Sequence, residues 1–230
     1  MKTKLSKRTI ALLAAAVIVL SGGGIMASRA QLTVFSTPYN ADFAMDHIGI
    51  NLVENDKVPT DKHLLSGIKP APGKEYKEEI AAANTTEFNQ YARIIIRKYW
   101  MKDGAKDPTM DPALIQLKYD GSDFNTAAWQ KSNRESTAEK QIYYFSKKLG
   151  SKEQTAPLFN TFSISKDIAD AKVSEEKDGV TVYTYKYDGY TAVVEAEVQS
   201  IQTHNANDAI MSVWGVEHVK ANGDDLTVTN

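Results

Sequence analysis

The stretch YTAVVEAEVQSIQ, residues 190–202, carries the clearest strand pattern in the chain. Every second residue of its first nine is small, apolar or aromatic, and the intervening positions include two glutamates. The repeating set is Tyr190, Ala192, Val194, Ala196 and Val198. This period of two predicts a half-buried β-strand. The pattern then shifts, because Ile201 rather than Ser200 is the next apolar residue, and the shift predicts either a β-bulge or the end of the strand.

The residues just before this strand predict its partner. The run VTVYTYKY, residues 180–187, is almost entirely β-branched or aromatic, which favours a strand. Asp188-Gly189 separates the two runs. Since Asp-Gly between two strand-forming runs is a strong hairpin signal, we expect 180–187 to pair with the strand at 190.

Other segments extend the β pattern. In QYARIIIRKYW, residues 90–100, one face is mostly apolar and the other mixes arginines with aromatics, so we expect a half-buried strand. Weaker strand patterns occur at 31–36, 41–55, 74–84 and 141–149. PALIQLKY, residues 112–119, is ambiguous between a helical turn begun by Pro112 and a strand.

Helix-forming sequence is scarce. The best candidate is NANDAIMSVWGV, residues 205–216, which Asn205 or Asn207 could cap and Gly215 could end. Its expected sheet-facing side chains are Ala209, Ile210, Val213 and Trp214. Many short strands and few helices predict an all-β fold, a jelly-roll-like β-sandwich with one or two short helices. We expect this single domain to cover residues 31–230, preceded by an N-terminal signal helix in residues 1–30.

The N-terminus has the three parts of an export signal. MKTKLSKR is basic, residues 9–20 are uncharged and apolar, and Ser28-Arg29-Ala30 provides small residues at a cleavage site. We expect cleavage between Ala30 and Gln31, which places the protein outside the cell or on its surface. The alternative is an uncleaved anchor on the outer face of the cytoplasmic membrane, because the glycines after the apolar run extend it to marginal spanning length.

Charge and cysteine content narrow the class of partner. The 230-residue chain has a net charge of −2 and no cysteine, so disulfides cannot stabilise it. Residues 1–30 hold five cationic and no anionic residues, and their removal leaves a net charge of −7. An acidic exported protein does not suit nucleic acid or anionic lipid, so we expect no nucleic-acid partner and membrane contact only through the signal.

The search for a catalytic or cofactor motif is negative. None of the four histidines has the H-E-x-x-H spacing, no serine lies in G-x-S-x-G, and no glycine-rich phosphate loop follows a strand. We therefore expect no catalytic residue and no cofactor. His47, His204 and Asp208 remain weak candidates for a metal site, against the simpler interpretation that local hydrogen bonds satisfy the histidines. The oxygen-rich loop 120–125 is more simply a solvated loop than a calcium site.

The aromatic residues leave one further alternative open. Tyrosines at 143, 144, 183, 185, 187 and 190 could line a sugar-binding face, or could be cross-strand pairs that stiffen a sheet. The second interpretation needs no ligand.

Three segments resemble the TasA/camelysin family of exported Gram-positive biofilm-matrix and cell-surface proteins. Behind the signal, the family's x-A-x-F-A-x-G-x-L-x-L strand is matched by Ala41, Phe43, Ala44, Ile48, Ile50 and Leu52. Gly73, Asn84 and the strand at 90–100 match the next segment, although Thr86 stands where the family often has glycine. The third match is VVEAEVQSIQTHNANDAIMSVWGV, residues 193–216.

The resemblance implies a jelly-roll matrix or surface protein that polymerises into fibres. The segment behind the cleavage site would leave its own domain and complete the sheet of the next copy. Gln31–Ser36 would then be the donor strand, with Leu32, Val34 and Phe35 as its pocket residues. The implied partners are further copies of this chain or related matrix subunits, together with a signal peptidase. The alternatives are a secreted camelysin-like metalloprotease, for which the chain lacks a zinc motif, and a monomeric surface-binding module.

Overall fold

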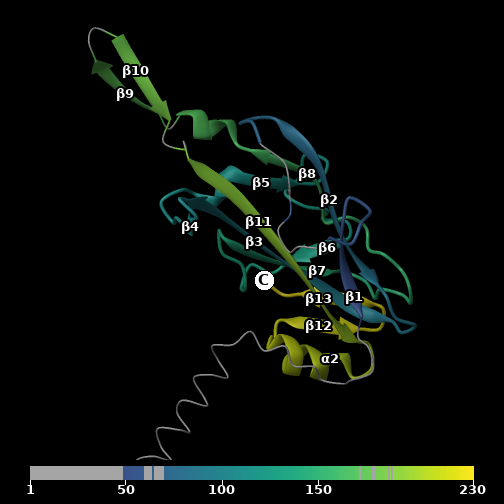
Figure 1. The fold of residues 1–230 in the computed structure, drawn as a ribbon. Helices are drawn as coiled ribbons and strands as arrows, with labels where there is room; N and C mark the ends of the chain where they lie inside the picture. Colours follow the sequence, from purple (N-terminus) through teal and green to yellow (C-terminus); the bar gives the residue numbers. More distant parts are fainter. Residues whose placement is uncertain are drawn as a thin grey trace, which may run out of the picture. The chain divides into compact units, whose positions relative to one another are not determined.

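Strands β3 (Gln90–Lys102) and β11 (Tyr190–Gln202) form a long antiparallel ladder that organises the protein. Both strands appear side by side in Figure 1, a computed structural model that describes residues 49–59, 64, 70–170, 172–177, 180–185, 187 and 189–230. The same sheet continues from β3 to β7 (Lys140–Phe145) and β6 (Trp129–Lys131), with the short β4 (Ala105–Lys106) paired to the end of β3. The order of this first sheet is therefore β11-β3-β7-β6.

A second antiparallel sheet has the order β1-β2-β8-β5. Its strands are β1 (Ile50–Glu54), β2 (Glu75–Asn84), β8 (Phe159–Ile164) and β5 (Ile115–Lys118). The register between β2 and β8 shifts between Lys77 and Ile80. PALIQLKY forms both of its expected structures, a 3₁₀ turn at Pro112–Leu114 (η1) followed at once by β5.

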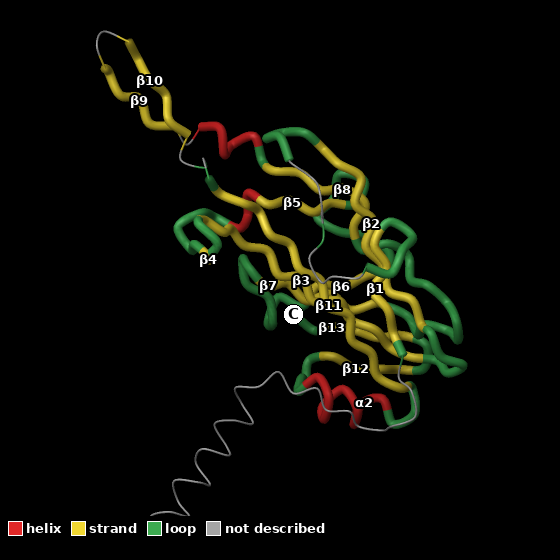
Figure 2. Tube along the Cα trace, in the orientation of Figure 1, coloured by secondary structure: helices red, strands yellow, loops and turns green. Residues whose placement is uncertain are grey.

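The two sheets pack face to face over one apolar core. Ile80 and Phe162 of the second sheet and Ile94 and Ile96 of the first are all fully buried in it. The chain crosses from one sheet to the other at each step through β2, β3, β5, β7, β8 and β11. The two packed antiparallel sheets confirm the prediction of an all-β sandwich with few and short helices. Figure 2 shows that helix is confined to short segments of the described chain.

A second apolar cluster covers the outer face of the first sheet. It forms under the outer cap, which consists of α2 (Ala206–Ala209), the π-helical turn η3 (Ile210–Trp214), β12 (Val219–Asn222) and β13 (Asp225–Val228). Tyr91 and Ile95 of β3 are buried there. The expectation that β3 is half-buried is therefore wrong for its first half, because both of its faces are covered.

The cap also explains the shifted pattern of β11. The predicted β-bulge is wrong, because Ser200 lies opposite Ala92 and Ile201 opposite Tyr91 without any change of register. Ile201 is buried under the cap on the outer face, whereas Val194 is buried in the sandwich. The apolar side chains change face along the strand, and the strand itself is regular.

The helix prediction is confirmed in position and partly wrong in orientation. Ile210 and Trp214 are buried against the sheet, but Val213 is 64% exposed. The reason is the wider π turn, in which the Gly215 N–H donates to the Ile210 C=O five residues earlier. In that turn residues four apart stay aligned, so Trp214 follows Ile210 and Val213 turns outward.

The predicted hairpin between 180–187 and the strand at 190 is also wrong. β10 (Val180–Tyr185) pairs with β9 (Lys172–Lys177) in a separate two-stranded sheet. A tight turn does form around Gly189, since the Tyr190 N–H donates to the Tyr187 C=O and Gly189 has a φ of +81°. It joins strands of different sheets, because β11 takes β3 as its partner.

The described residues belong to one compact unit, Asp46–Asn230. The signal helix and the domain boundary expected at residue 30 lie outside the described residues. No helix among the residues that the structure describes is long and apolar enough to cross a membrane. The strand expected at 141–149 ends at Phe145, after which Lys147 and Leu149 make single bridges to Asp225 and Gln90.

Candidate functional site

Most of the residues predicted to take part in export and assembly lie outside the described residues. These are the cleavage-site residues Ala30 and Gln31 and the donor residues Leu32, Val34 and Phe35. The metal candidate His47 also lies outside the described residues. Among the described residues, the feature that bears on the assembly hypothesis is an open sheet edge, because an open edge can pair with an added strand.

β11 lies at the end of its sheet, and the direction of its backbone groups follows from the ladder with β3. The Lys98 N–H donates to Glu139 on the β7 side of β3, so even-numbered residues of β3 face β7 and odd-numbered residues face β11. The register pairs odd-numbered residues with odd-numbered ones, as Ile95 with Glu197. Even-numbered residues of β11 therefore direct their N–H and C=O groups away from the sheet.

We call the outward backbone groups of residues 192–200 the β11 edge. Its one backbone hydrogen bond from the described residues is donated by the Leu64 N–H to the Val194 C=O, at 2.9 Å. β1 lies next to β11 but forms its ladder with β2. Within the described chain, β11 is thus one of the two edge strands of its sheet, and the outward backbone groups of Ala196, Val198 and Ser200 have no backbone hydrogen bond from other described residues.

The metal candidates inside the described chain do not form a site. His204 lies in the turn after β11 and Asp208 in the first turn of α2, and both side chains are exposed. The structure records no ion pair between them. Among the described residues, no group of three or more His, Asp or Glu side chains is arranged to hold a metal ion.

The tyrosines divide between structural roles and one surface hollow. Tyr143 is buried in the sandwich core against Phe124 and Phe159, and Tyr144 is buried on the outer face beneath Trp214. Tyr187 and Tyr190 instead line a hollow of about 290 Å³ at the end of the sandwich where β11 begins. We call this the aromatic hollow; its other lining residues include Pro70, Pro72, Trp100 and Ile168.

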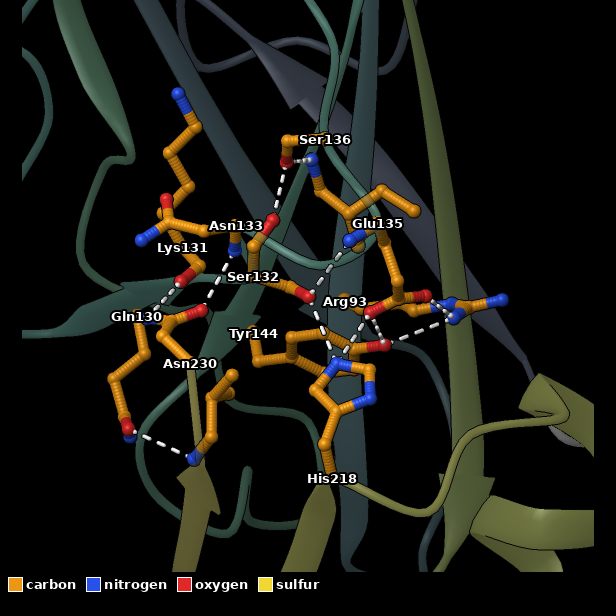
Figure 3. Close-up of polar contacts among 12 residues, drawn as sticks. Arg93, Gln130, Lys131, Ser132, Asn133, Glu135, Ser136, Tyr144, His218 and Asn230 are labelled. Atoms are coloured by element: carbon orange, nitrogen blue, oxygen red, sulfur yellow. Dashed lines mark hydrogen bonds and ion pairs between the residues drawn. The ribbon is translucent and has the colours of Figure 1, made fainter.

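A polar cluster under the outer cap brings together a serine, a histidine and a glutamate (Figure 3). The His218 Nε2 lies 2.8 Å from the Ser132 Oγ and 3.1 Å from the Glu135 Oε2. The Tyr144 hydroxyl donates to the same Glu135 oxygen at 2.8 Å, and the Arg93 Nη1 lies 3.4 Å from the other. Burial raises the pKa of Tyr144 well above its usual range, so this hydroxyl stays a donor.

The geometry of this cluster is not that of a catalytic triad. In a triad, the histidine uses one ring nitrogen for the nucleophile and the other for the carboxylate. Here the Nε2 of His218 faces both Ser132 and Glu135. Ser132 is also fully buried and cannot meet a substrate. The cluster joins the residue that precedes β12 to β3, β7 and the turn after β6, so it attaches the outer cap to the sheet.

We expect Glu135→Ala to lower the free energy of unfolding by about 3 kcal/mol, because it leaves the buried Arg93 guanidinium without its carboxylate. Urea denaturation measures this change. Glu139→Ala is the matched control, since Glu139 pairs with Lys106 at the exposed surface and its removal should cost at most about 0.5 kcal/mol. Equal losses in the two variants would contradict the structural role assigned to the cluster.

A buried carboxyl group lies in the other sheet. Glu78 is 1% exposed, its Oε2 accepts from the Asn55 Nδ2 at 3.2 Å, and its Oε1 has no hydrogen-bond partner. Burial, followed by the neighbouring Glu54 carboxyl, raises the pKa of Glu78 to about 8. The alternation of β2 contains the signal for this burial, because Glu78 shares its face with Ile80 and Ala82.

The chain was compared with known proteins in three ways. No protein-family model, no curated protein and no solved structure matches it.

Proposed function

We propose that this is an exported structural protein of the cell surface or extracellular matrix, whose copies assemble into fibres. In this proposal, cleavage after Ala30 releases the segment Gln31–Ser36, which adds as a strand to the β11 edge of the next copy. The observation that supports the proposal most is the β11 edge itself: a long strand of the described fold whose outward backbone groups are mostly unused.

Among the described residues, the β11 edge beyond Val194 has little of the usual protection of an edge strand. Natural sheets guard their edges with bulges, prolines, lysines or very short strands, since an open edge templates pairing with another chain. β11 is 13 residues long, runs without a register shift, and contains neither proline nor lysine. An edge of this kind is either a hazard or a binding surface, and an exported protein that must remain soluble until it assembles favours the second.

The donor segment has the chemistry that such an edge accepts. In QLTVFS, Leu32 and Val34 fall on one face of an extended strand. The inward face of β11 beside the edge carries Ala196 and Val198, which pack on the sandwich core. An added strand would therefore supply backbone hydrogen bonds to the edge and two apolar side chains to the core, which is the mode of strand addition.

A proline placed on the β11 edge tests the proposal while the donor segment Gln31–Ser36 stays intact. The Ser200 N–H points outward, so Ser200→Pro removes one N–H group from the β11 edge without breaking the ladder with β3. The change loses no side-chain hydrogen bond, because the buried Ser200 Oγ has no partner. We expect the chain 31–230 with this change to remain a folded monomer and to form no filaments in negative-stain electron microscopy and sedimentation.

Gln199→Pro is the matched control, because residue 199 bonds to Arg93 within the ladder. We expect it to lower the free energy of unfolding by about 3 kcal/mol or more, as proline does inside a sheet. Normal filaments from the folded Ser200→Pro chain would refute the assignment of the β11 edge as the acceptor.

A further inference from the structure

Phe88 is the most exposed large apolar side chain of the described residues, at 66%, yet its backbone is held on both sides. Its C=O accepts from the Asn84 Nδ2 at 2.6 Å and from the Thr86 Oγ1 at 3.2 Å, and its N–H donates to the same hydroxyl at 3.3 Å. A backbone bonded in this way fixes the point and the direction from which the side chain of Phe88 leaves the surface.

The whole turn from residue 84 to residue 90, which we call the Phe88 loop, is fixed by buried polar side chains. Asn84 also donates to the Gly150 C=O at 2.8 Å, and the Gln90 Nε2 donates to the Thr86 Oγ1 at 2.9 Å. Asn84, Thr86 and Gln90 are all buried. A preorganised loop loses little conformational entropy on binding, so an exposed aromatic ring on it is well suited to anchor a partner.

The aromatic hollow lies at the opposite end of the sandwich from the Phe88 loop. Phe88 precedes the first residue of β3, whereas Trp100, near the other end of β3, lines the hollow. The intervening strand separates the two sites by about 40 Å, at about 3.3 Å per residue. One copy cannot bring Phe88 to its own hollow, but two copies placed end to end can. The hollow's volume of about 290 Å³ suits one large apolar side chain better than an extended ligand.

The point at which the chain enters the fold indicates which end meets the next copy. The C=O of Gly49, the first described residue, accepts from the Thr85 N–H at 3.1 Å and from the Gln90 Nε2 at 3.3 Å. Gly49, where the described chain begins, therefore lies beside the Phe88 loop. The β11 edge begins at the other end of the sandwich, beside the aromatic hollow, which Thr191 and Ala192 help to line.

We propose that Phe88 of one copy inserts into the aromatic hollow of the next copy. The inference rests on the proposed function and adds to it a second contact between the same two copies. The contact joins two different surfaces of the same chain, so it repeats without closing and extends a fibre. Ring packing against Trp100, Tyr187 and Tyr190, with Pro70 and Pro72 completing the hollow, would bury the exposed phenyl group.

The first test is the assembly of the chain 31–230 with Phe88→Ala. We expect the critical concentration for filaments, measured by sedimentation, to rise at least tenfold, while the thermal unfolding of the monomer stays unchanged because the ring is exposed. Val213→Ala, which truncates a side chain of similar exposure on the outer cap, is the control and should assemble normally. A Phe88→Leu chain should fall between Phe88→Ala and the unaltered chain.

The second test uses the absence of cysteine from the chain. Copies carrying Asn89→Cys, an exposed position next to an intact Phe88, are mixed under mild oxidation with copies carrying Thr191→Cys, a residue that lines the hollow. We expect the mixed disulfide to exceed both self-pairs, and a Gly104→Cys copy, placed on an exposed turn, to give no excess.

The outcomes separate this inference from the proposed function. If removal of residues 31–38 abolishes filaments while Phe88→Ala leaves the critical concentration unchanged and no mixed disulfide forms, the Phe88 contact is wrong and strand donation stands. If the unaltered chain 31–230 never assembles and the two cysteine-substituted copies give no mixed disulfide, both are overturned. Binding of a wall glycan in the hollow of a monomer, lost on Tyr190→Ala and unaffected by Phe88→Ala, would also overturn the contact and favour a binding module.

Discussion

Removal of residues 31–38 from the chain that begins at Gln31 is expected to abolish filament formation and leave a folded monomer. The segment would supply the backbone groups that satisfy the β11 edge and the apolar side chains of Leu32 and Val34. Each intermolecular backbone hydrogen bond contributes about 1 kcal/mol, and several form together with the burial of two apolar residues. We expect the critical concentration to rise at least about a hundredfold, equivalent to about 2.7 kcal/mol.

Sedimentation velocity and electron microscopy over a range of concentrations measure this effect, and thermal unfolding shows whether the monomer is intact. A chain in which Leu32 and Val34 are replaced by Asp keeps the length of the segment and should behave like the deletion. A chain with Thr33→Ser is the matched control and should assemble normally. Filaments of normal appearance from the shortened chain would refute strand donation.

The second large effect concerns pH. A carboxyl group with a higher pKa in the folded state than in the unfolded state favours folding while it is protonated. The pKa of Glu78 rises from 4.5 to about 8 on burial beside Glu54. The contribution of protonated Glu78 to the free energy of unfolding is therefore complete below about pH 4.5 and is lost as the pH rises to about 8. We expect the free energy of unfolding to fall over this range by at most about 5 kcal/mol from this group.

Glu78→Gln should remove this fall, because the amide stays neutral and can still accept from the Asn55 Nδ2. The variant is expected to be more stable than the unaltered protein at pH 8 and to match it at pH 4.5, as measured by urea denaturation at each pH. Glu79→Gln, at the next position and paired with Lys77, is the control and should change stability little at either pH. A Glu78→Gln chain that is less stable at pH 8 would contradict the burial of a neutral carboxyl group.

The sequence predicts the two long strands well because each carries a strong local signal. The alternation of 190–198 and the run of isoleucines in β3 depend on their own side chains, so the pattern alone reveals the strand. The class of fold then follows from the number of such segments and the scarcity of helix. The weaker strands, among them β6, β8 and β12, have little pattern of their own and form because neighbouring strands supply their partners.

The wrong predictions about strands share one physical cause, which is the choice of partner. The chain has an Asp-Gly pair at 178–179 as well as at 188–189, and the first separates β9 from β10. Local turn chemistry cannot decide between them, since the outcome depends on the long ladder that β11 forms with β3. The supposed bulge at Ser200 and the half-exposed face of β3 have a similar origin, because the outer cap comes from residues near the C-terminus.

Of the candidate site, too, only one part could be predicted from the sequence. The donor segment can be proposed from the sequence, because alternating apolar residues follow a cleavage site. The β11 edge can be recognised only when the order of the strands in the sheet is known. Phe88 gives no signal in the sequence, since its exposure and its fixed backbone depend on Asn84, Thr86 and Gln90 acting together. The cluster around His218 joins residues that lie more than 80 positions apart and is visible only in the fold.

Residue-resolved amide hydrogen exchange along β11, in the monomer and in the filament, tests the central claim most directly. The odd-numbered amides, such as those of Glu197 and Gln199, bond to β3 and should exchange slowly in both states. The outward amides of Ala196, Val198 and Ser200 should exchange fast in the monomer and become protected in the filament. Outward amides that exchange equally fast in both states would contradict the assignment of β11 as the strand that receives its partner from the next copy.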